Sequence, residues 1–261
     1  MRLTFLGTSS SRGMPRDGHT DALCTDALIP GSKSRRGRSS VLIEQDKANI
    51  LIDATPDFVE QISREKVSRI STVFLTHAHG DASGGLQQLG AWIHKQNHQP
   101  IPLYGHPSTI EAVRARIPNN IIPRPTKPFA SLNVSGEKIV CLPVNHGVYH
   151  IATFGYLFPK KLFYASDMDG TPAKTIALIK GTPTLILDGT FWERQIIRGH
   201  FTTIQSIEFA KKVKPRRLIL TQLGHTHPPH AEAVRLLSKI VKKQKCTFLV
   251  QLAYDGLKIK I

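Results

Sequence analysis

The sequence THAHGDA at residues 76–82 decides the fold of this 261-residue chain. It follows directly on the run Thr72 to Leu75, whose apolar and β-branched residues predict a short buried strand. Two histidines two residues apart on a tight loop can both turn toward one metal ion. A carboxylate two residues further on can reach the same ion or a neighbouring one. The motif therefore predicts a metal site that includes His77, His79 and Asp81.

Three more candidate ligands each follow another predicted strand. His146 comes after the strand that ends at Val144, Asp167 follows the strand that ends at Ala165, and His225 lies just past Thr221. A histidine or aspartate at the end of strand after strand is hard to explain as a structural accident. Imidazoles and carboxylates together suit a borderline cation such as zinc or manganese, with one position left for water.

Strands and helices alternate over the rest of the chain. The period of apolar residues predicts strands at Arg2–Leu6, Ser40–Glu44, Ile50–Asp53, Thr72–Leu75, Ile101–Tyr104, Lys138–Leu142, Ala152–Phe158, Leu162–Ala165, Thr184–Leu187, Arg217–Thr221 and Thr247–Leu252. It predicts helices at Pro56–Glu65, Leu86–Lys95, from Ser108 onward, Thr203–Val213 and Ala231–Lys242. The pattern indicates an α/β fold with two mixed β-sheets face to face and helices outside.

The sequence also predicts a turn, a loop and the number of domains. A turn at Asp46-Lys47 is expected to join the second and third strands into a hairpin, and Pro118–Pro128 is expected to be a loop. Without an interdomain linker or a repeat in the sequence, residues 1–261 are expected to form a single domain.

Composition limits the class of protein. No stretch of 18 apolar residues is present, so no membrane span is expected. Three widely separated cysteines argue against a disulfide framework and favour the reducing cytoplasm. A formal net charge of +16 favours polyanionic or phosphorylated partners, although a generally basic, solvated surface would give the same value.

The chain resembles the metallo-β-lactamase-fold hydrolases. The resemblance is carried by the histidine motif, by Thr4-Phe5-Leu6-Gly7-Thr8-Ser9 and by Leu51-Ile52-Asp53-Ala54. Gly13-Met14-Pro15 and Pro143-Val144-Asn145-His146 match most closely the phosphodiesterases that open phosphoribosyl cyclic phosphates. The quinone-cofactor biosynthesis B proteins share much of the same pattern. The resemblance implies a four-layer αββα sandwich.

The resemblance also implies roles for particular residues. His77, His79 and His146 would hold a first metal ion, and Asp167 would be able to bridge to a second. Asp53 would orient a ligand histidine from behind. His200, in the sequence Gly199-His200-Phe201-Thr202, would handle the phosphate and protonate the leaving oxygen, unless it is a loop histidine without a role.

Two departures from the family pattern affect the second metal. Ala82 stands where the family has a histidine after the aspartate, and Gln222 stands where it has one after Thr221. The second site would keep Asp81 and Asp167, with Asp169 as a further carboxylate. Such a site holds transition metals weakly, so we expect one firmly bound zinc or manganese ion and a second ion that is absent, weak or a hard ion.

A third departure lies in the first loop, where relatives carry cysteines that hold a structural zinc. The corresponding residues here are His19, Asp21 and Cys24, with His225 as the fourth ligand. Such a mixed set can bind zinc tetrahedrally, or the loop packs without metal. His227 and His230 could substitute for one of the four ligands. Cys24 is expected in a polar loop, and the isolated histidines His94, His98, His106 and His150 are expected at the surface.

These residues predict a hydrolase of a small cyclic or nucleotide-like phosphodiester, with Asp81 and His200 as the catalytic groups. The basic run Lys33–Arg38 either binds phosphate near the metal or forms a solvated turn. A catalytically degenerate metal-binding protein and a tRNA-processing nuclease are the alternatives. Nucleic acid is a less favoured partner than a small phosphodiester, and a homodimer is an expectation from the family.

Overall fold

The computed structural model describes residues 1–45, 48–147 and 151–261, and its strands form two mixed seven-stranded sheets. In spatial order, the first sheet consists of β14 (Lys258–Lys260), β1 (Arg2–Gly7), β2 (Ser40–Glu44), β3 (Asn49–Ile52), β4 (Thr72–Phe74), β5 (Ile101–Gly105) and β6 (Ile121–Pro125). The second consists of β13 (Leu249–Leu252), β12 (Arg217–Thr221), β11 (Thr184–Asp188), β10 (Leu162–Ala165), β9 (Thr153–Phe158), β8 (Glu137–Val144) and β7 (Ser131–Val134).

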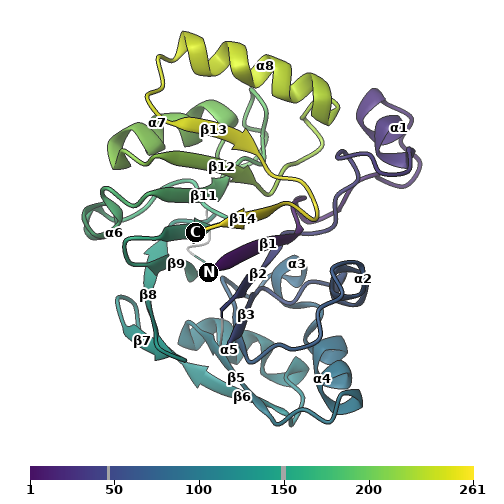
Figure 1. Cartoon of the computed structure of the whole chain (residues 1–261), viewed down its shortest axis with the longest axis vertical. Helices are drawn as coiled ribbons and strands as arrows, with labels where there is room; N and C mark the ends of the chain where they lie inside the picture. Colours follow the sequence, from purple (N-terminus) through teal and green to yellow (C-terminus); the bar gives the residue numbers. More distant parts are fainter. Residues whose placement is uncertain (46–47, 148–150) are drawn as a thin grey trace.

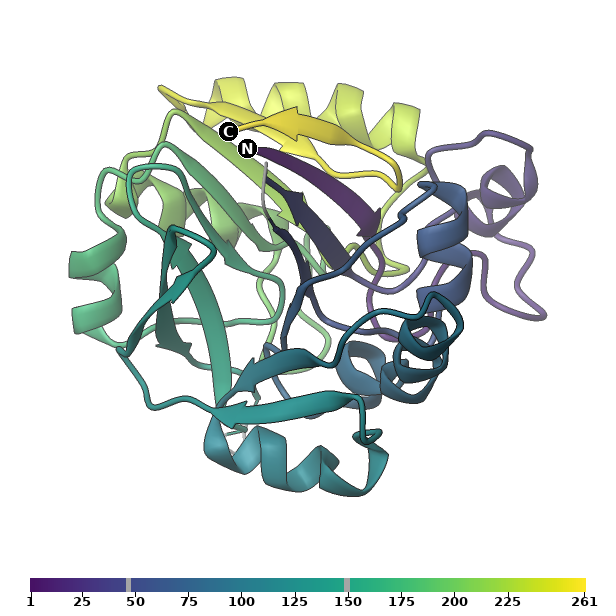
Figure 2. The ribbon, with the colours of Figure 1, turned by 60° about the horizontal axis from the view of Figure 1, so that its bottom comes forward.

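Helices cover the outer faces of both sheets (Figure 1). The described helices are α1 (Ala22–Leu28), α2 (Phe58–Arg64), α3 (Gly80–Ser83), α4 (Leu86–Lys95), α5 (Pro107–Val113), α6 (Ala173–Ile179), α7 (Thr203–Val213) and α8 (His230–Lys243), with a 3₁₀ turn at Arg114–Arg116. α2, α4 and α5 lie on the side of the first sheet, and α6, α7 and α8 on the side of the second (Figures 1 and 2).

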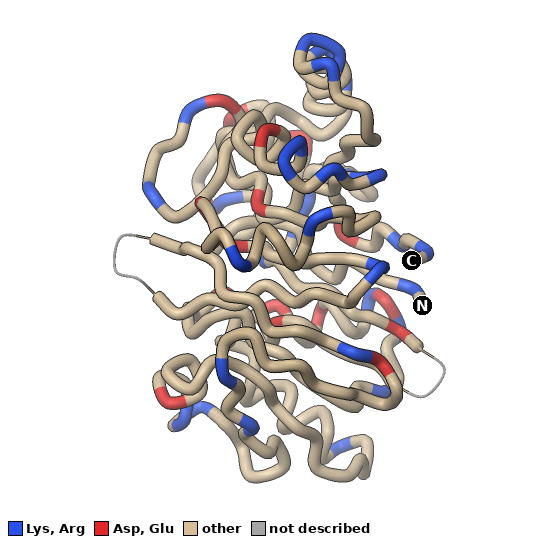
Figure 3. The backbone as a smooth tube through the Cα atoms, turned by 90° about the vertical axis from the view of Figure 1, so that its left-hand side faces the viewer, with Lys and Arg blue, Asp and Glu red and all other residues tan. Residues whose placement is uncertain are grey.

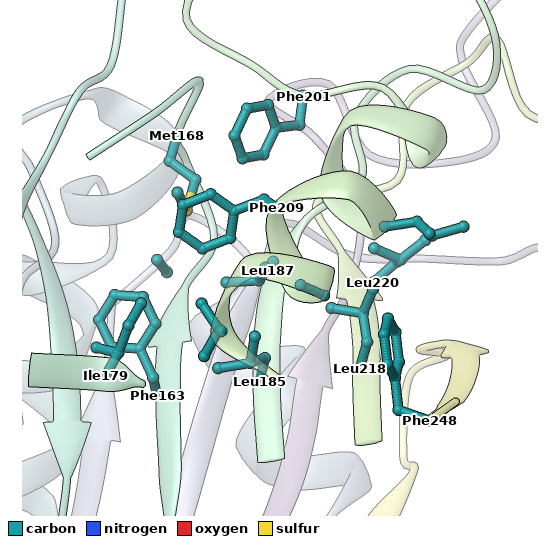
Figure 4. Packing of buried hydrophobic residues seen from close by; sticks show 14 of the residues in the cluster. Phe163, Met168, Ile179, Leu185, Leu187, Phe201, Phe209, Leu218, Leu220 and Phe248 are labelled. Atoms are coloured by element: carbon teal, nitrogen blue, oxygen red, sulfur yellow. The ribbon is translucent and has the colours of Figure 1, made fainter. Parts of the chain in front are cut away.

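Three hydrophobic clusters account for this layering. Phe5, Ile43 and Tyr156 belong to a central cluster between the two sheets. A second cluster joins the first sheet to α2, α4 and α5, and a third joins the second sheet to α6, α7 and α8. Figure 4 shows part of the third, in which Phe209 packs close to Met168 and Phe201. The predicted αββα arrangement is therefore confirmed.

The ends of several strands meet at one edge of this sandwich. β3, β4 and β5 run parallel in the first sheet, as do β10, β11 and β12 in the second, so their carboxyl ends share an edge. β8 runs in the same direction as β10, because each is antiparallel to β9. The backbone N–H of Phe154 donates to the carbonyl of Thr76 at 2.9 Å and links the two sheets beside the predicted site.

The structure corrects some of the predicted elements. Pro118–Pro128 is not all loop, because β6 pairs in parallel with β5 at the edge of the sheet, where prolines are tolerated in a strand. The last strand is the three-residue β14, which pairs with β1 and is too short to show a period. The predicted turn at Asp46-Lys47 lies outside the described residues, and so does His150.

The placement of the charged residues and the character of the described helices agree with what the composition predicts. Lysines and arginines, 35 in all against 19 acidic residues, are spread over the backbone, as the blue segments of Figure 3 show. In the described part of the chain, no helix combines the length and the apolar character that a membrane crossing requires.

Candidate metal centre and active site

Three histidines from two different elements converge between the sheets. His77 and His79 come from the loop after β4, and His146 from the loop after β8. One ring nitrogen of each lies within 4.8 Å of the others, and Nε2 of His146 stands 3.3 Å from Nδ1 of His79. The structure therefore brings together the three imidazoles that the sequence predicted.

Asp53 and Thr76 fix the orientation of His77. The Asp53 carboxylate accepts hydrogen bonds from the Thr76 backbone N–H at 2.8 Å and from the Thr76 hydroxyl at 2.9 Å. The hydroxyl oxygen lies 2.9 Å from Nδ1 of His77, which is then the protonated ring nitrogen. Asp53 thus acts on His77 through Thr76 and leaves Nε2 as the free lone pair. The backbone of Asp53 has a φ of 66°, a strained conformation that is often found at functional sites.

A glycine carries out the same task for His146. Nδ1 of His146 donates to the carbonyl of Gly199 at 2.8 Å, and the backbone N–H of Gly199 donates to Asp169 at 2.9 Å. A Cβ at position 199 would stand 2.4 Å from the backbone nitrogen of Gly147, so only glycine fits here. Asp169, considered as a ligand from the sequence, therefore positions the loop that orients His146.

The chemistry of these donors fits a metal ion. Nε2 of His77 is buried and has no hydrogen-bond partner among the described residues, although such atoms are nearly always paired. Burial lowers the pKa of His77 to about 3, so the imidazole is neutral, as a ligand must be. Two of the rings are held by second hydrogen bonds of the kind that metal-binding histidines make.

Asp167 lies beside this centre but is held by its neighbours. Its Oδ1 accepts a hydrogen bond from the Gln222 side-chain amide at 2.7 Å, and its Oδ2 accepts one from the Ser166 hydroxyl at 2.6 Å. Gln222 has a φ of 60° and directs its amide into the position where the family pattern has a histidine. Gln222 thus holds Asp167 through a hydrogen bond, and Ala82 offers no ligand atom.

His200 completes a second cluster with His146 and Asp167, whose candidate ligand atoms lie within 4.8 Å of one another. Nδ1 of His200 lies 2.6 Å from the Asp188 carboxylate. Burial lowers the pKa of His200, but the charge and hydrogen bond of Asp188 outweigh it and raise that pKa to about 9. His200 is therefore an imidazolium at neutral pH, with Nε2 left for a ligand.

Asp188 was missed in the sequence, although a signal for it was present. It ends β11, just as Asp53 and Asp167 follow the strands β3 and β10. Backbone N–H groups of Met168 and Thr190 donate to its two carboxylate oxygens at 3.1 Å and 2.8 Å. The rule that selected the other aspartates at strand ends would therefore also have selected Asp188.

Asp81 lies on the short helix α3, directly after the histidine loop. It belongs to neither cluster of candidate ligand atoms among the described residues. Burial, together with the negative charge of Asp167, raises the pKa of Asp81 to about 6. The Asp81 carboxylate is therefore repelled by the charge of Asp167 and takes up a proton more readily than an exposed aspartate.

A small cavity of about 220 Å³ opens beside the histidine centre. His146 lines it together with Asn145, Phe154 and His106. The ring of Phe154 contacts that of His106 at a centroid distance of 5.4 Å, so one wall is aromatic. Neither His77 nor His79 is part of this lining, so the cavity adjoins the centre through His146.

The first loop and the segment after β12 together form a separate cluster of four candidate ligands. One ligand atom from each residue lies within 4.8 Å of the others, and the residues are those predicted from the sequence: His19, Asp21, Cys24 and His225. Sγ of Cys24 lies 3.3 Å from Nε2 of His225, close to the ligand separation in a tetrahedral zinc site. The Asp21 carboxylate caps α1 with one oxygen and faces His225 at 2.8 Å with the other.

Two expectations about this loop are wrong. Cys24 does not lie in a polar loop, because Asp21 starts the helix α1 and Cys24 is buried on its inner side. His227 and His230 do not join the four ligands, because His227 contacts the carbonyl of Gly189 and His230 contacts Arg36. Exposed His94 agrees with the expectation for isolated histidines, whereas His98 and His106 are half-buried.

Replacing Cys24 with serine tests whether this cluster holds metal. We expect the Cys24→Ser protein to lose about one equivalent of zinc and to unfold about 5 °C or more below the wild type, because a bound ion stabilises the folded state. Elemental analysis and differential scanning calorimetry measure the two effects. Cys246→Ser, outside any such cluster, is the control. An unchanged zinc content would mean that the loop packs without metal.

Comparisons with known proteins agree with this geometry. Residues 48–222 match the model of the β-lactamase superfamily domain. The octanoyltransferase of Porphyromonas gingivalis is 26% identical over 271 aligned positions, which cover 98% of this chain and 51% of that protein. The ribonuclease Z of a Picosynechococcus species is 28% identical over 171 positions, which cover 62% and 48%. The chain thus spans about half the length of these curated relatives.

Among solved structures, the chain is similar to a diphosphatase from the PhnP family. The sequence identity is 28% and the TM-score is 0.85. The match covers 100% of this chain and 97% of the other. The fold and the superfamily expected from the sequence are therefore confirmed.

Proposed function

Because this chain belongs to the β-lactamase superfamily, we propose that it is a metal-dependent phosphodiesterase acting on a small cyclic or nucleotide-like phosphodiester. The observation that carries the proposal is the pairing of a three-histidine centre with the His200 imidazolium, since the cation suits a phosphate and its leaving oxygen. The similarity to a diphosphatase supports chemistry at phosphorus. The 220 Å³ cavity beside His146 supports a small substrate.

The proposed metal centre is His77, His79 and His146, with Asp167 able to contribute a carboxylate. A zinc or manganese ion bound there would supply Lewis-acid activation of water and of the phosphoryl oxygen. The neutral imidazole of His77, with its orphaned Nε2, suits either ion. The four-residue loop cluster is proposed as a separate structural zinc site.

The residues of this chain handle the protons in the proposed reaction. Asp81 takes the proton of the attacking water as the new phosphorus–oxygen bond forms. The phosphorus–oxygen bond to the leaving group breaks with its electron pair on that oxygen, which receives the proton of His200 Nε2. Asp188 keeps the imidazole protonated and oriented for this transfer.

Hydrolysis of bis-p-nitrophenyl phosphate by the purified chain tests the proposal. We expect turnover with added zinc or manganese, measured as release of p-nitrophenolate and checked beside the metal content. A chain that binds about one ion at the histidine centre and shows no turnover with any divalent ion would contradict the proposal. That result would favour the degenerate metal-binding protein.

Restoring the two missing histidines tests whether Ala82 and Gln222 prevent the binding of a second ion. We expect Ala82→His/Gln222→His to bind about one more equivalent of metal than the wild type. The variant gains two imidazoles and loses the hydrogen bond from the Gln222 side chain to Asp167. Elemental analysis after dialysis measures this gain. Gln222→Leu is the matched control, since it removes the hydrogen bond to Asp167 without adding a ligand atom. An unchanged metal content in the double variant would contradict the role assigned to Gln222.

Nuclease activity is the second candidate function. It is favoured by the net charge of +16 and by the similarity to ribonuclease Z over part of the chain. A precursor tRNA with a 3′ extension, incubated with the metal-loaded protein and analysed on a denaturing gel, distinguishes the two candidates. Cleavage at one position would favour the nuclease, and an intact RNA beside active hydrolysis of the small diester would favour our proposal.

A further inference from the structure

The position of His200 depends on a segment that has left the sheet. Nδ1 of His200 lies 2.6 Å from the carboxylate of Asp188, which ends β11, and 3.2 Å from the Thr190 hydroxyl. Residues 189–192, called here the 189–192 segment, lie between β11 and α7, outside any helix or strand. Asp188 is thus fixed by the sheet, whereas Thr190 and His200 both lie in loops.

The 189–192 segment is joined to the chain around His200. The backbone N–H of Phe191 donates to the carbonyl of Phe201 at 3.2 Å, and the N–H of Thr203 donates to the carbonyl of Phe191 at 2.8 Å. Because Phe201 directly follows His200, a movement of the 189–192 segment would carry His200 with it. The contact between His200 and Asp188 therefore requires that this segment keep its place against the sheet.

A second loop, residues 224–227 after β12, lies against the 189–192 segment. The backbone N–H of Gly224 donates to the carbonyl of Thr190 at 3.0 Å, and the N–H of Trp192 donates to the Thr226 hydroxyl at 2.9 Å. A Cβ at position 224 would stand 2.6 Å from the Thr190 carbonyl oxygen, so only glycine allows this close approach. The 224–227 loop therefore holds the backbone that carries Thr190.

His227 makes the third contact of this loop, from a buried position. Only 3% of its surface is exposed, and its ring packs edge-on against Trp192 at a centroid distance of 5.2 Å. Nε2 of His227 lies 2.7 Å from the carbonyl oxygen of Gly189, which only accepts hydrogen bonds, so Nε2 carries the proton. Among the described residues, no backbone N–H outside the strands and helices donates to this carbonyl. An apolar side chain at position 227 would leave the carbonyl unpaired where water is excluded.

The ring of His227 belongs to none of the clusters of candidate metal ligands in the described part of the chain. His225 is the ligand that the 224–227 loop supplies to the loop cluster. Compared with an apolar residue of similar size, what a histidine adds at the buried position 227 is the hydrogen bond to Gly189. This hydrogen bond acts on the residue directly after Asp188.

We propose that His227 is a positioning residue for His200, acting through the carbonyl of Gly189. The proposal rests on the function proposed above, in which Nε2 of His200 protonates the leaving oxygen. His227 holds the 189–192 segment in place, so that the ring of His200 stays on Asp188. A displacement of about 1 Å can slow a reaction by about 10²-fold. Attack by metal-activated water does not use this ring and should be affected far less.

The pair His227→Leu and His227→Gln tests the proposal. Leucine fills a similar volume without a donor, and the glutamine amide can reach the place of Nε2. With a diester that has a methyl leaving group, we expect kcat of His227→Leu to fall by about tenfold to 10²-fold. With a p-nitrophenyl leaving group, which departs without a proton, the fall should be less than about threefold. His227→Gln should resemble the wild type with both esters.

A proton NMR spectrum of the zinc-loaded chain gives a second readout that needs no turnover. The Nδ1 proton that His200 donates to Asp188 belongs to a short hydrogen bond of 2.6 Å and should resonate far downfield. Its absence from His200→Gln identifies the signal. We expect the signal to disappear or shift in His227→Leu and to remain in His227→Gln. A wild type that shows the signal and hydrolyses neither ester would contradict the proposed function, and the signal in His227→Leu would then decide the positioning role alone.

Two results would overturn the proposal. One is a His227→Leu protein that keeps the downfield signal and the wild-type ratio of kcat for the two esters. The other is an equal fall in kcat with both esters, since a general loss of folded protein would produce it and a displaced proton donor would not.

If circular dichroism shows that His227→Leu does not fold, an exposed residue of the same loop provides the test. Thr226→Val removes the hydroxyl that accepts from the Trp192 N–H, and Thr226→Ser keeps it. A fall of about threefold or more for the methyl ester in Thr226→Val, absent from Thr226→Ser, would support positioning of His200 by the 224–227 loop. A wild-type ratio of kcat for the two esters in both variants would overturn it.

Discussion

The His79→Ala protein is expected to lose the metal ion of the histidine centre and at least about 10³-fold of its diesterase turnover. Nδ1 of His79 lies 3.3 Å from Nε2 of His146, so removing this ring leaves two imidazoles where a tetrahedral site needs three protein ligands. His79 is exposed and lies outside the central hydrophobic cluster, so its removal leaves the core intact. Elemental analysis and p-nitrophenolate release measure the two losses.

The control for this experiment is His94→Ala, which removes an exposed histidine that joins no cluster. It should keep both metal content and turnover. The loop cluster of four ligands supplies an internal reference, because its ion should remain in the His79→Ala protein. Full turnover by His79→Ala after metal loss at the centre would mean that another part of the chain carries out the hydrolysis.

The histidine centre could be predicted because its ligands are linked to local sequence signals. His77 and His79 directly follow an apolar run, and the loop after β8 carries His146 in the same way. Parallel strands of a sandwich end at the same edge, so the residues that directly follow them are expected to lie close together there. The αββα layering followed from the same alternation of apolar periods.

What remained hidden depends on contacts between distant residues. The path from Asp169 through Gly199 to His146 joins three loops, and no spacing in the sequence reveals it. The burial of Arg36 was equally invisible, since a run of basic residues is usually a solvated surface. β6 was missed because its two prolines read as a loop, and only its edge position makes them compatible with a strand.

Gln222 shows how a departure in the sequence gains meaning from the structure. In the sequence it is the absence of a histidine, which predicts only a weaker second site. In the structure its amide donates a hydrogen bond to Asp167 at 2.7 Å. The change at Gln222 therefore holds Asp167 in place as well as removing a ligand.

Replacing His200 with glutamine is expected to slow hydrolysis by about 10²–10⁴-fold when the leaving group is a poor one, such as an alkoxide, because general acid catalysis typically contributes that much. The loss should be much smaller with p-nitrophenolate, which leaves without a proton. Comparing kcat for a methyl and a p-nitrophenyl ester measures the difference. Equal losses for both esters would indicate that His200 positions the site and does not transfer a proton.

The pH dependence of hydrolysis distinguishes a proton-donating role of His200 from a role in positioning the site. The pKa of His200 is raised to about 9, so the imidazolium persists at neutral pH, and activity that needs it should fall as the pH rises through that value. In Asp188→Asn the charge that raises this pKa is gone while burial, which lowers it, remains, so the alkaline limb should move down by about two pH units. Thr190→Val, which removes a weaker contact with Nδ1 at 3.2 Å, is the matched control and should move the limb far less. A limb that stays in place in Asp188→Asn would mean that a group other than His200 supplies the proton.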